Sequence, residues 1–321
     1  MLQFRFGRLA AGALMAALAL AGAAHGVETG PLDQLRQRAL ELVNRERADR
    51  GLEALRLQDG LNEAAQNHAE DMLRRNYYSH TSPEGESVQD RFLDAGGSRW
   101  KLTAENIARC QGCPSPPTED RVEELHQGWM DSPPHRENIL RQGLASFGFG
   151  IAVGDDRTLY AVQTFAGPGT SRDRQPEEAS ALDRQEQNAL LEKRLNRART
   201  REDLPPVETH PALVEAAAQL LPQADPGSFT AGESSNPMDA LPADARMQWS
   251  SLAVVMATCG GCGTRPTAGD VRSFLQQWLD NPQYRDRLLD RSFTHAGFII
   301  RANGDGLKSA LLVLGRQRQR P

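Results

Sequence analysis

Residues 129–140 read WMDSPPHRENIL, and residues 278–289 read WLDNPQYRDRLL. The two segments carry tryptophan, aspartate, proline, arginine and leucine at matching positions, 149 residues apart. In the first segment Ser132 followed by Pro133 is a typical helix start, with serine as the N-cap and proline at the first helical position. The match indicates that the chain uses one structural plan twice.

The correspondence extends in both directions from these segments. Cysteines 110 and 113 match cysteines 259 and 262 at the same offset, and Gly148-Phe149 matches Gly297-Phe298. Upstream, residues 42–66 resemble residues 194–219 at an offset of 152, a shift that one loop deletion explains. We therefore predict a duplication, with a first copy at 27–167, a charged Gly/Pro-initiated linker at 168–187 and a second, degenerate copy at 188–321.

The N-terminus has the pattern of a secretory signal. Arg5 and Arg8 precede an apolar run, Leu9–Ala24, that ends in small residues. This pattern predicts a signal peptide at 1–26 and a secreted or periplasmic protein. The alternative is an uncleaved membrane anchor, but the run is short for a spanning helix. No other stretch approaches that length, so we expect no stable membrane span after cleavage.

The composition excludes some classes of partner. A net charge of -5 gives no electrostatic case for binding nucleic acid, and 39% hydrophobic with 25% charged residues is normal for a globular protein. The positive charge is almost entirely arginine, since lysine occurs only at Lys101, Lys193 and Lys308.

Periodicity predicts the local structure of the first copy. Apolar residues at helical spacing predict helices over 32–50, 61–75 and 119–130, and FGFGIAVGDDRTLYAVQTF predicts a hairpin with strands at 147–153 and 158–165. Helices followed by a small antiparallel sheet indicate an α+β layered domain. Trp129 and Trp278 are expected in the core, while Asn44 and Arg45, which recur as Asn196 and Arg197, are expected to hold the fold.

Three segments place polar residues within apolar surroundings. YYSHTSPEG contains His80, AENIA contains Glu105, and WMDSPPHRENIL contains Asp131 and His135. Two neutral imidazoles can hold a divalent ion such as zinc, and nearby carboxylates can orient them. The alternative is that these histidines are hydrogen-bonded loop and cap residues.

These motifs, in this order, resemble bacterial CAP domains, also called SCP-like domains, the family of cysteine-rich secretory proteins and plant pathogenesis-related proteins. The resemblance covers roughly residues 32–167 and implies an α-β-α sandwich with a cleft that carries two histidines and two acids. By position these are His80, His135 and Glu105, with Asp131 as the second acid and Glu124 as a weaker candidate. We expect His68 to be a core residue and His126 to lie on a helix surface.

The second copy lacks most of this set. Tyr284 stands at the place of His135, Val254 at the place of Glu105, and only Asp280 is retained, opposite Asp131. No histidine lies between residues 221 and 249, where the counterpart of His80 belongs. We therefore expect the first copy alone to hold a ligand or ion.

The cysteines form two C-x-x-C pairs. In an exported chain the default prediction is a disulfide within each pair, Cys110–Cys113 and Cys259–Cys262. A four-thiolate zinc site, disulfides between the copies, free thiols and redox activity are the alternatives, the last without a thioredoxin-like context.

The resemblance implies a domain and leaves the reaction open. The first hypothesis is a non-catalytic exported protein that binds a small molecule, a lipid or an envelope component through the cleft. The second is a metal-assisted hydrolase that uses His80, Glu105 and His135, and the third is a protein interaction module. The sequence shows no recognisable nucleophile that would support the hydrolase hypothesis.

Overall fold

The computed structural model describes residues 30–173, 175–221 and 236–318. The predicted signal peptide at 1–26 lies outside the described residues. Among the described residues no helix is long and apolar enough to cross a membrane.

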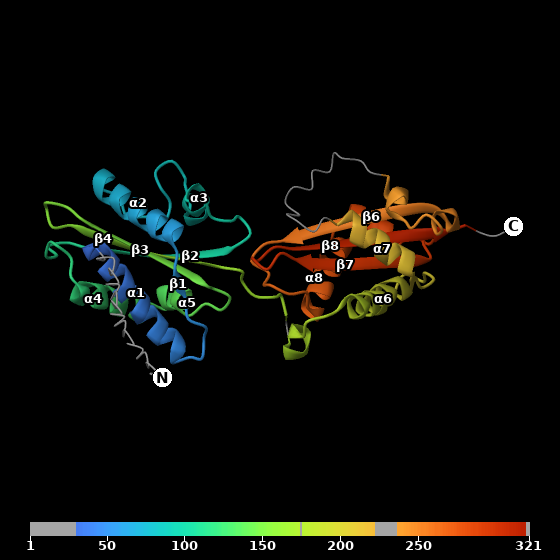
Figure 1. Cartoon of the computed structure of the whole chain (residues 1–321), viewed down its shortest axis with the longest axis horizontal. Helices are drawn as coiled ribbons and strands as arrows, with labels where there is room; N and C mark the ends of the chain where they lie inside the picture. The colour runs from blue at the N-terminus through green and yellow to red at the C-terminus, as the bar shows by residue number, and fades with distance from the viewer. Residues whose placement is uncertain (1–29, 174, 222–235, 319–321) are drawn as a thin grey trace, which may run out of the picture.

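The first half of the chain, residues 30–167, is a four-stranded sheet between two layers of helices (Figure 1). The strands lie in the order β1-β3-β4-β2; β1 runs parallel to β3, and the other neighbours are antiparallel. The elements are α1 (Pro31–Ala48), β1 (Arg56–Leu57), α2 (Asp59–Arg75), α3 (Val88–Asp94), β2 (Leu102–Cys110), α4 (Glu119–Asp131), α5 (Pro133–Ile139), β3 (Ser146–Val153) and β4 (Leu159–Gly167).

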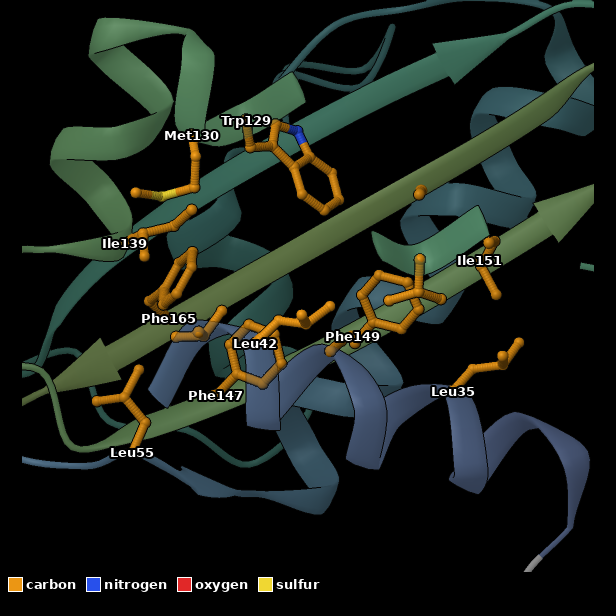
Figure 2. Packing of buried hydrophobic residues seen from close by; sticks show 14 of the residues in the cluster. Leu35, Leu42, Leu55, Trp129, Met130, Ile139, Phe147, Phe149, Ile151 and Phe165 are labelled. Atoms are coloured by element: carbon orange, nitrogen blue, oxygen red, sulfur yellow. The ribbon is translucent and has the colours of Figure 1, made fainter. Parts of the chain in front are cut away.

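The helices divide between the two faces of this sheet. α1, α4 and α5 cover one face, and α2 and α3 cover the other (Figure 1). Leu42 of α1, Trp129 of α4, and Phe147 and Phe165 of the hairpin meet in the larger cluster, which is closed to solvent (Figure 2). The α-β-α sandwich and the three long predicted helices are thereby confirmed, as is the hairpin.

The shared glycines of the two halves bring a helix close to the sheet. A Cβ on Gly148 would lie 2.2 Å from the backbone of Leu61 in α2. A Cβ on Gly297 would lie 2.1 Å from the backbone of Leu213 in the second half. Since real side chains never approach backbone atoms so closely, only glycine allows these helices to pack at this depth.

The second half, residues 168–318, repeats the arrangement of the first. Its sheet has the order β5-β7-β8-β6, with the same parallel and antiparallel pairs, and α6 and α8 cover one face while α7 covers the other. The elements are a 3-10 turn (Pro176–Ala179), α6 (Arg184–Thr200), β5 (Glu208–Thr209), α7 (Pro211–Leu220), two further 3-10 turns (Pro237–Ala240 and Arg246–Gln248), β6 (Trp249–Cys259), α8 (Ala268–Asp280), α9 (Pro282–Leu288), β7 (His295–Ala302) and β8 (Lys308–Gln317).

Equivalent side chains hold the two halves in the same way. The amide of Asn44 exchanges two hydrogen bonds with the backbone of Leu55, and Asn196 does the same with Val207. The arginine that accompanies this asparagine is Arg47, not the Arg45 that the sequence suggested, because Arg45 points into solvent.

Arg47 is 1% exposed and donates to the carbonyl oxygens of Glu53, Ile139 and Arg141. Its counterpart Arg199 is fully buried and binds four carbonyl oxygens in the second half. Each guanidinium group therefore holds the loop that follows a short helix, α5 in the first half and α9 in the second.

The predicted linker is part of the second half. α6 begins at Arg184, inside the predicted 168–187 segment, where Asp183 and Glu186 form a capping box. Residues 168–173 and 175–181, here called the strap, form bridges from Gly169 to Cys262 and from Ala181 to Thr267, and the 3-10 turn within the strap contacts α8. The two halves meet where the backbone of Gly261 donates to Trp100 at 2.7 Å.

Candidate functional site

Glu105 is the centre of the polar group in the first half. It lies on β2, at the open edge of the sheet, and its side chain is 2% exposed. Its Oε1 accepts a hydrogen bond from Nδ1 of His80 at 2.8 Å, and its Oε2 accepts one from Nη2 of Arg91 at 2.8 Å. Both carboxylate oxygens therefore have a partner inside the protein.

Arg91 ties the loop that carries His80 to this carboxylate. Its side chain is 8% exposed and also donates to the backbone oxygens of His80 and Glu86, each at 3.0 Å. This role could not be predicted from the sequence, because α3 is only seven residues long and nothing local distinguishes Arg91 from the many other arginines.

His135 reaches the same edge from the opposite face. It lies in the first turn of α5, and its backbone oxygen accepts from the amide of Asn106 at 3.2 Å. Asn138 links Asn106 to the backbone oxygen of Glu105, with hydrogen bonds of 2.9 and 3.0 Å. Partial burial holds the pKa of His135 below its usual range, and the nearby charge of His80 lowers it further.

Neither predicted second acid joins this group. Asp131 is exposed at the end of α4, where it accepts from Gln127 at 2.9 Å, and Glu124 is exposed and paired with Arg121. Within the described residues, no hydrogen bond or ion pair links Asp131 to His80, Glu105 or His135. The α4 helix directs both carboxylates away because its buried stripe is occupied by Val122, His126 and Trp129.

The two remaining histidines of this half are both buried. His68 is a core residue, as expected, with Nε2 at 3.0 Å from the backbone oxygen of Ser79 and 3.9 Å from Oε1 of Glu105. The surface position expected for His126 is wrong, because its side chain is 5% exposed and neither ring nitrogen has a partner among the described residues. It lies on the buried face of α4, which packs on α1.

The donor set fits an open site with two imidazole ligands. The carboxylate of Glu105 accepts from Nδ1 of His80, so Nε2 is the ring nitrogen that remains available, and 53% of the His80 side chain is exposed. The ring of His135 has no hydrogen bond from any described residue. Throughout residues 30–173, 175–221 and 236–318, no cluster of three or more histidine, cysteine, aspartate or glutamate side chains is arranged to hold a metal ion. Any ion held here would draw its further ligands from solvent.

The equivalent edge of the second half has different chemistry. Tyr284 packs against the apolar cluster of that half, and the backbone oxygen of Val254 accepts from Arg287 at 3.0 Å. The counterpart of His80 falls near residues 229–232, outside the described residues. The two C-x-x-C pairs each form their own disulfide, Cys110–Cys113 and Cys259–Cys262.

Residues 40–165, most of the first half, match the model of the cysteine-rich secretory protein family, CAP.

Individual proteins show the same likeness. The chain is 34% identical over 114 residues to YkwD of Bacillus subtilis (strain 168), an alignment that covers 36% of this chain and 41% of YkwD. It is 29% identical to a solved extracellular protein containing an SCP domain from Bacillus anthracis str. Ames, covering 41% of this chain and 40% of that one with a TM-score of 0.34. The chain thus spans about two fifths of the length of both proteins. The crystal structure of Na-ASP-1 aligns over 92% of both chains at 10% identity and a TM-score of 0.39.

Proposed function

We propose that this chain is an exported binding protein whose first half takes its ligand at the edge of β2, through His80, Glu105 and His135. The observation that carries the proposal is the arrangement of Glu105, which holds His80 by Nδ1 and is itself held by Arg91. This arrangement presents Nε2 of the imidazole to solvent in one orientation. The N-terminal pattern at residues 5–24 supports export of the protein.

A divalent cation such as Zn²⁺ is the first candidate ligand. The chain would offer it Nε2 of His80 and a ring nitrogen of His135, while Glu105 would act behind His80 as the carboxylate that fixes its tautomer. A structural zinc site has four protein ligands, so two imidazoles imply an open site with weaker binding. Such a site leaves positions at which a small molecule or an envelope component can coordinate.

Binding is favoured over hydrolysis by the state of Glu105. A general base needs a carboxylate oxygen free to take a proton from water, and both oxygens of Glu105 are occupied by His80 and Arg91. Asp131, the other acid expected, lies on the exposed end of α4. The first half thus offers ligands for an ion without an obvious base beside them.

Titration of Zn²⁺ into the mature full chain by isothermal calorimetry tests the proposal. We expect one equivalent to bind the wild type, and His80→Ala or His135→Ala to weaken binding by at least about tenfold. Glu105→Gln should weaken it as well, because the amide no longer fixes the tautomer of His80.

The matched control is His210→Ala with His295→Ala, a second histidine pair whose ring centroids lie 5.6 Å apart in the second half. These changes should leave zinc binding unaltered. A wild type that binds no zinc, or that loses its zinc in the control variant, would overturn the proposed site.

A further inference from the structure

The second half buries a lysine and an aspartate against each other. Nζ of Lys308 on β8 lies 2.5 Å from Oδ2 of Asp270 on α8, and the two side chains are 0% and 1% exposed. Nζ also lies 2.8 Å from Oγ of Ser171 in the strap. The strap thus contributes a further contact to this buried pair.

The fold does not require charged groups at this place. By the 149-residue offset, Lys308 matches Leu159, which is fully buried in the first half, and Asp270 matches Arg121. An apolar side chain therefore fills the same strand position without any ion pair. The chain also uses arginine almost everywhere, so a lysine, which can lose its proton and act as a nucleophile, is the unusual choice here.

Burial favours the uncharged forms of both partners. It lowers the pKa of the Lys308 amine and raises the pKa of the Asp270 carboxyl, although each partner pulls the other in the opposite direction. Burying two charges is costly even when they are paired, and transfer of one proton from the ammonium to the carboxylate removes both. Burial thus favours a free amine beside a carboxylic acid, with Nζ 2.5 Å from Oδ2.

A second carboxylate completes the group. Oδ1 of Asp173, in the strap, accepts from the hydroxyl of Thr267 at 2.8 Å, and the same hydroxyl lies 3.1 Å from Oδ2 of Asp270. The charge of Asp173 also acts on Lys308. Asp173 is therefore linked through the Thr267 hydroxyl to Oδ2, the oxygen that would leave, and its charge reaches the amine.

We propose that Lys308 and Asp270 condense to an amide, an intramolecular isopeptide bond that joins β8 to α8. The lone pair of Nζ attacks Cγ of the protonated carboxyl group and forms the C–N bond. A proton passes from the nitrogen, by way of Asp173, to the departing hydroxyl group, and the C–O bond breaks as water leaves. No oxidant or other reactant is needed, and the fixed geometry replaces the activation that an amide normally requires.

The intact mass of the folded full chain, measured after denaturation with its disulfides intact, tests this directly. We expect a mass lower than that of the sequence, corrected for the two disulfides and the removed signal peptide, by one water molecule. Fragmentation should find a branched peptide that joins residue 270 to residue 308.

Two variants sharpen the test. Lys308→Met places an apolar side chain where the first half has leucine, so it should fold and show the full mass. Asp173→Asn should form the bond about 100-fold more slowly, because it removes the proton relay. A wild type with the full mass, or a water deficit that persists in Lys308→Met, would overturn the proposal.

Discussion

Two arginines show most clearly how single residues hold this fold. Arg47 and Arg199 are buried at equivalent places, and each donates hydrogen bonds to backbone oxygens after the short helix of its half. Desolvation lowers the pKa of each guanidinium, yet arginine keeps its charge at any physiological pH. The repeat in the sequence predicts the structural role of Asn44 but assigns the second role to Arg45 instead of Arg47. Both Arg45 and Arg47 recur in the second half, and only the burial of Arg47 in the structure distinguishes them.

Arg47→Ala should therefore destabilise the first half by about 3 kcal/mol, since it leaves three carbonyl oxygens without a donor. Arg45→Ala is the matched control and should change the free energy of unfolding by no more than about 0.5 kcal/mol, because its side chain is exposed. Urea unfolding of the two variants measures the difference. Equal effects would show that the buried contacts are not what makes Arg47 important.

His126 should make the first half sensitive to acid. Burial has the largest effect and lowers the pKa of its imidazole. The charge of Glu46 on α1 raises this pKa by a smaller amount, and the charge of Arg45 on the same helix lowers it. Its folded pKa lies below the unfolded value of about 6.5, so the unfolded chain binds the proton first and stability falls as the pH drops through about 6.5.

His126→Leu should remove part of that loss, so the stability of the variant should fall less steeply than that of the wild type between about pH 7.5 and pH 5. Denaturant unfolding at several pH values checks this. Parallel curves for the two proteins would contradict the prediction. They would mean that the pH dependence comes from groups present in both proteins, such as His68, whose pKa is also lowered.

Among the elements, the edge strands distinguish the two halves. On β2, the outward backbone oxygen of Ile107 accepts from Nε1 of Trp129 at 3.0 Å and from the hydroxyl of Tyr78 at 3.1 Å. On β6 the corresponding Trp278 is fully buried, but its Nε1 has no partner among the described residues. Side chains therefore cover the edge of β2 where the candidate site lies.

Trp129→Phe should consequently be more destabilising than Trp278→Phe, by about 1 kcal/mol. Both changes remove the same ring volume, but only the first also breaks a hydrogen bond. Urea unfolding of the two variants gives the comparison. A larger loss for Trp278→Phe would mean that its indole N–H has a partner after all.

Long elements were predictable from the sequence and short ones were not. α1, α2 and α4 repeat apolar residues over three or more turns, so their periodicity defines them. α3 has only seven residues, and β2 shows no alternation because α2 and α3 on one face and α5 on the other both contact it. Three of the four predicted site residues come together on or beside β2, whereas Arg91 on α3 could be found only from the structure.

At the scale of the whole molecule, the strap packs on the loop that meets the first half, through a contact that only small residues permit. A Cβ on Gly169 would lie 2.0 Å from the backbone oxygen of Gly261, and Lys101 pairs with Asp305 across the same junction at 2.9 Å. The disulfide loop of the second half, 259–262, lies in this junction. The loop 110–113 of the first half instead contacts the turn of its own hairpin through Arg157.

Gly169→Ala should loosen this junction. Gly112→Ala is a matched control, because both glycines have a left-handed backbone, with φ of 72° and 71°, while the space around Gly112 is open. Small-angle scattering should show a larger radius of gyration for Gly169→Ala alone, and limited proteolysis should cut its strap faster. If Gly112→Ala behaved in the same way, backbone strain rather than the contact would be responsible.

We propose that the first half binds the ligand, while the second half supplies a related frame without the binding residues. Histidine-resolved NMR of the full mature chain during zinc titration distinguishes the two halves. We expect the imidazole signals of His80 and His135 to shift together and saturate at one equivalent, while those of His210 and His295 stay unchanged. Shifts at His210 and His295 with His80 and His135 unaffected would contradict it.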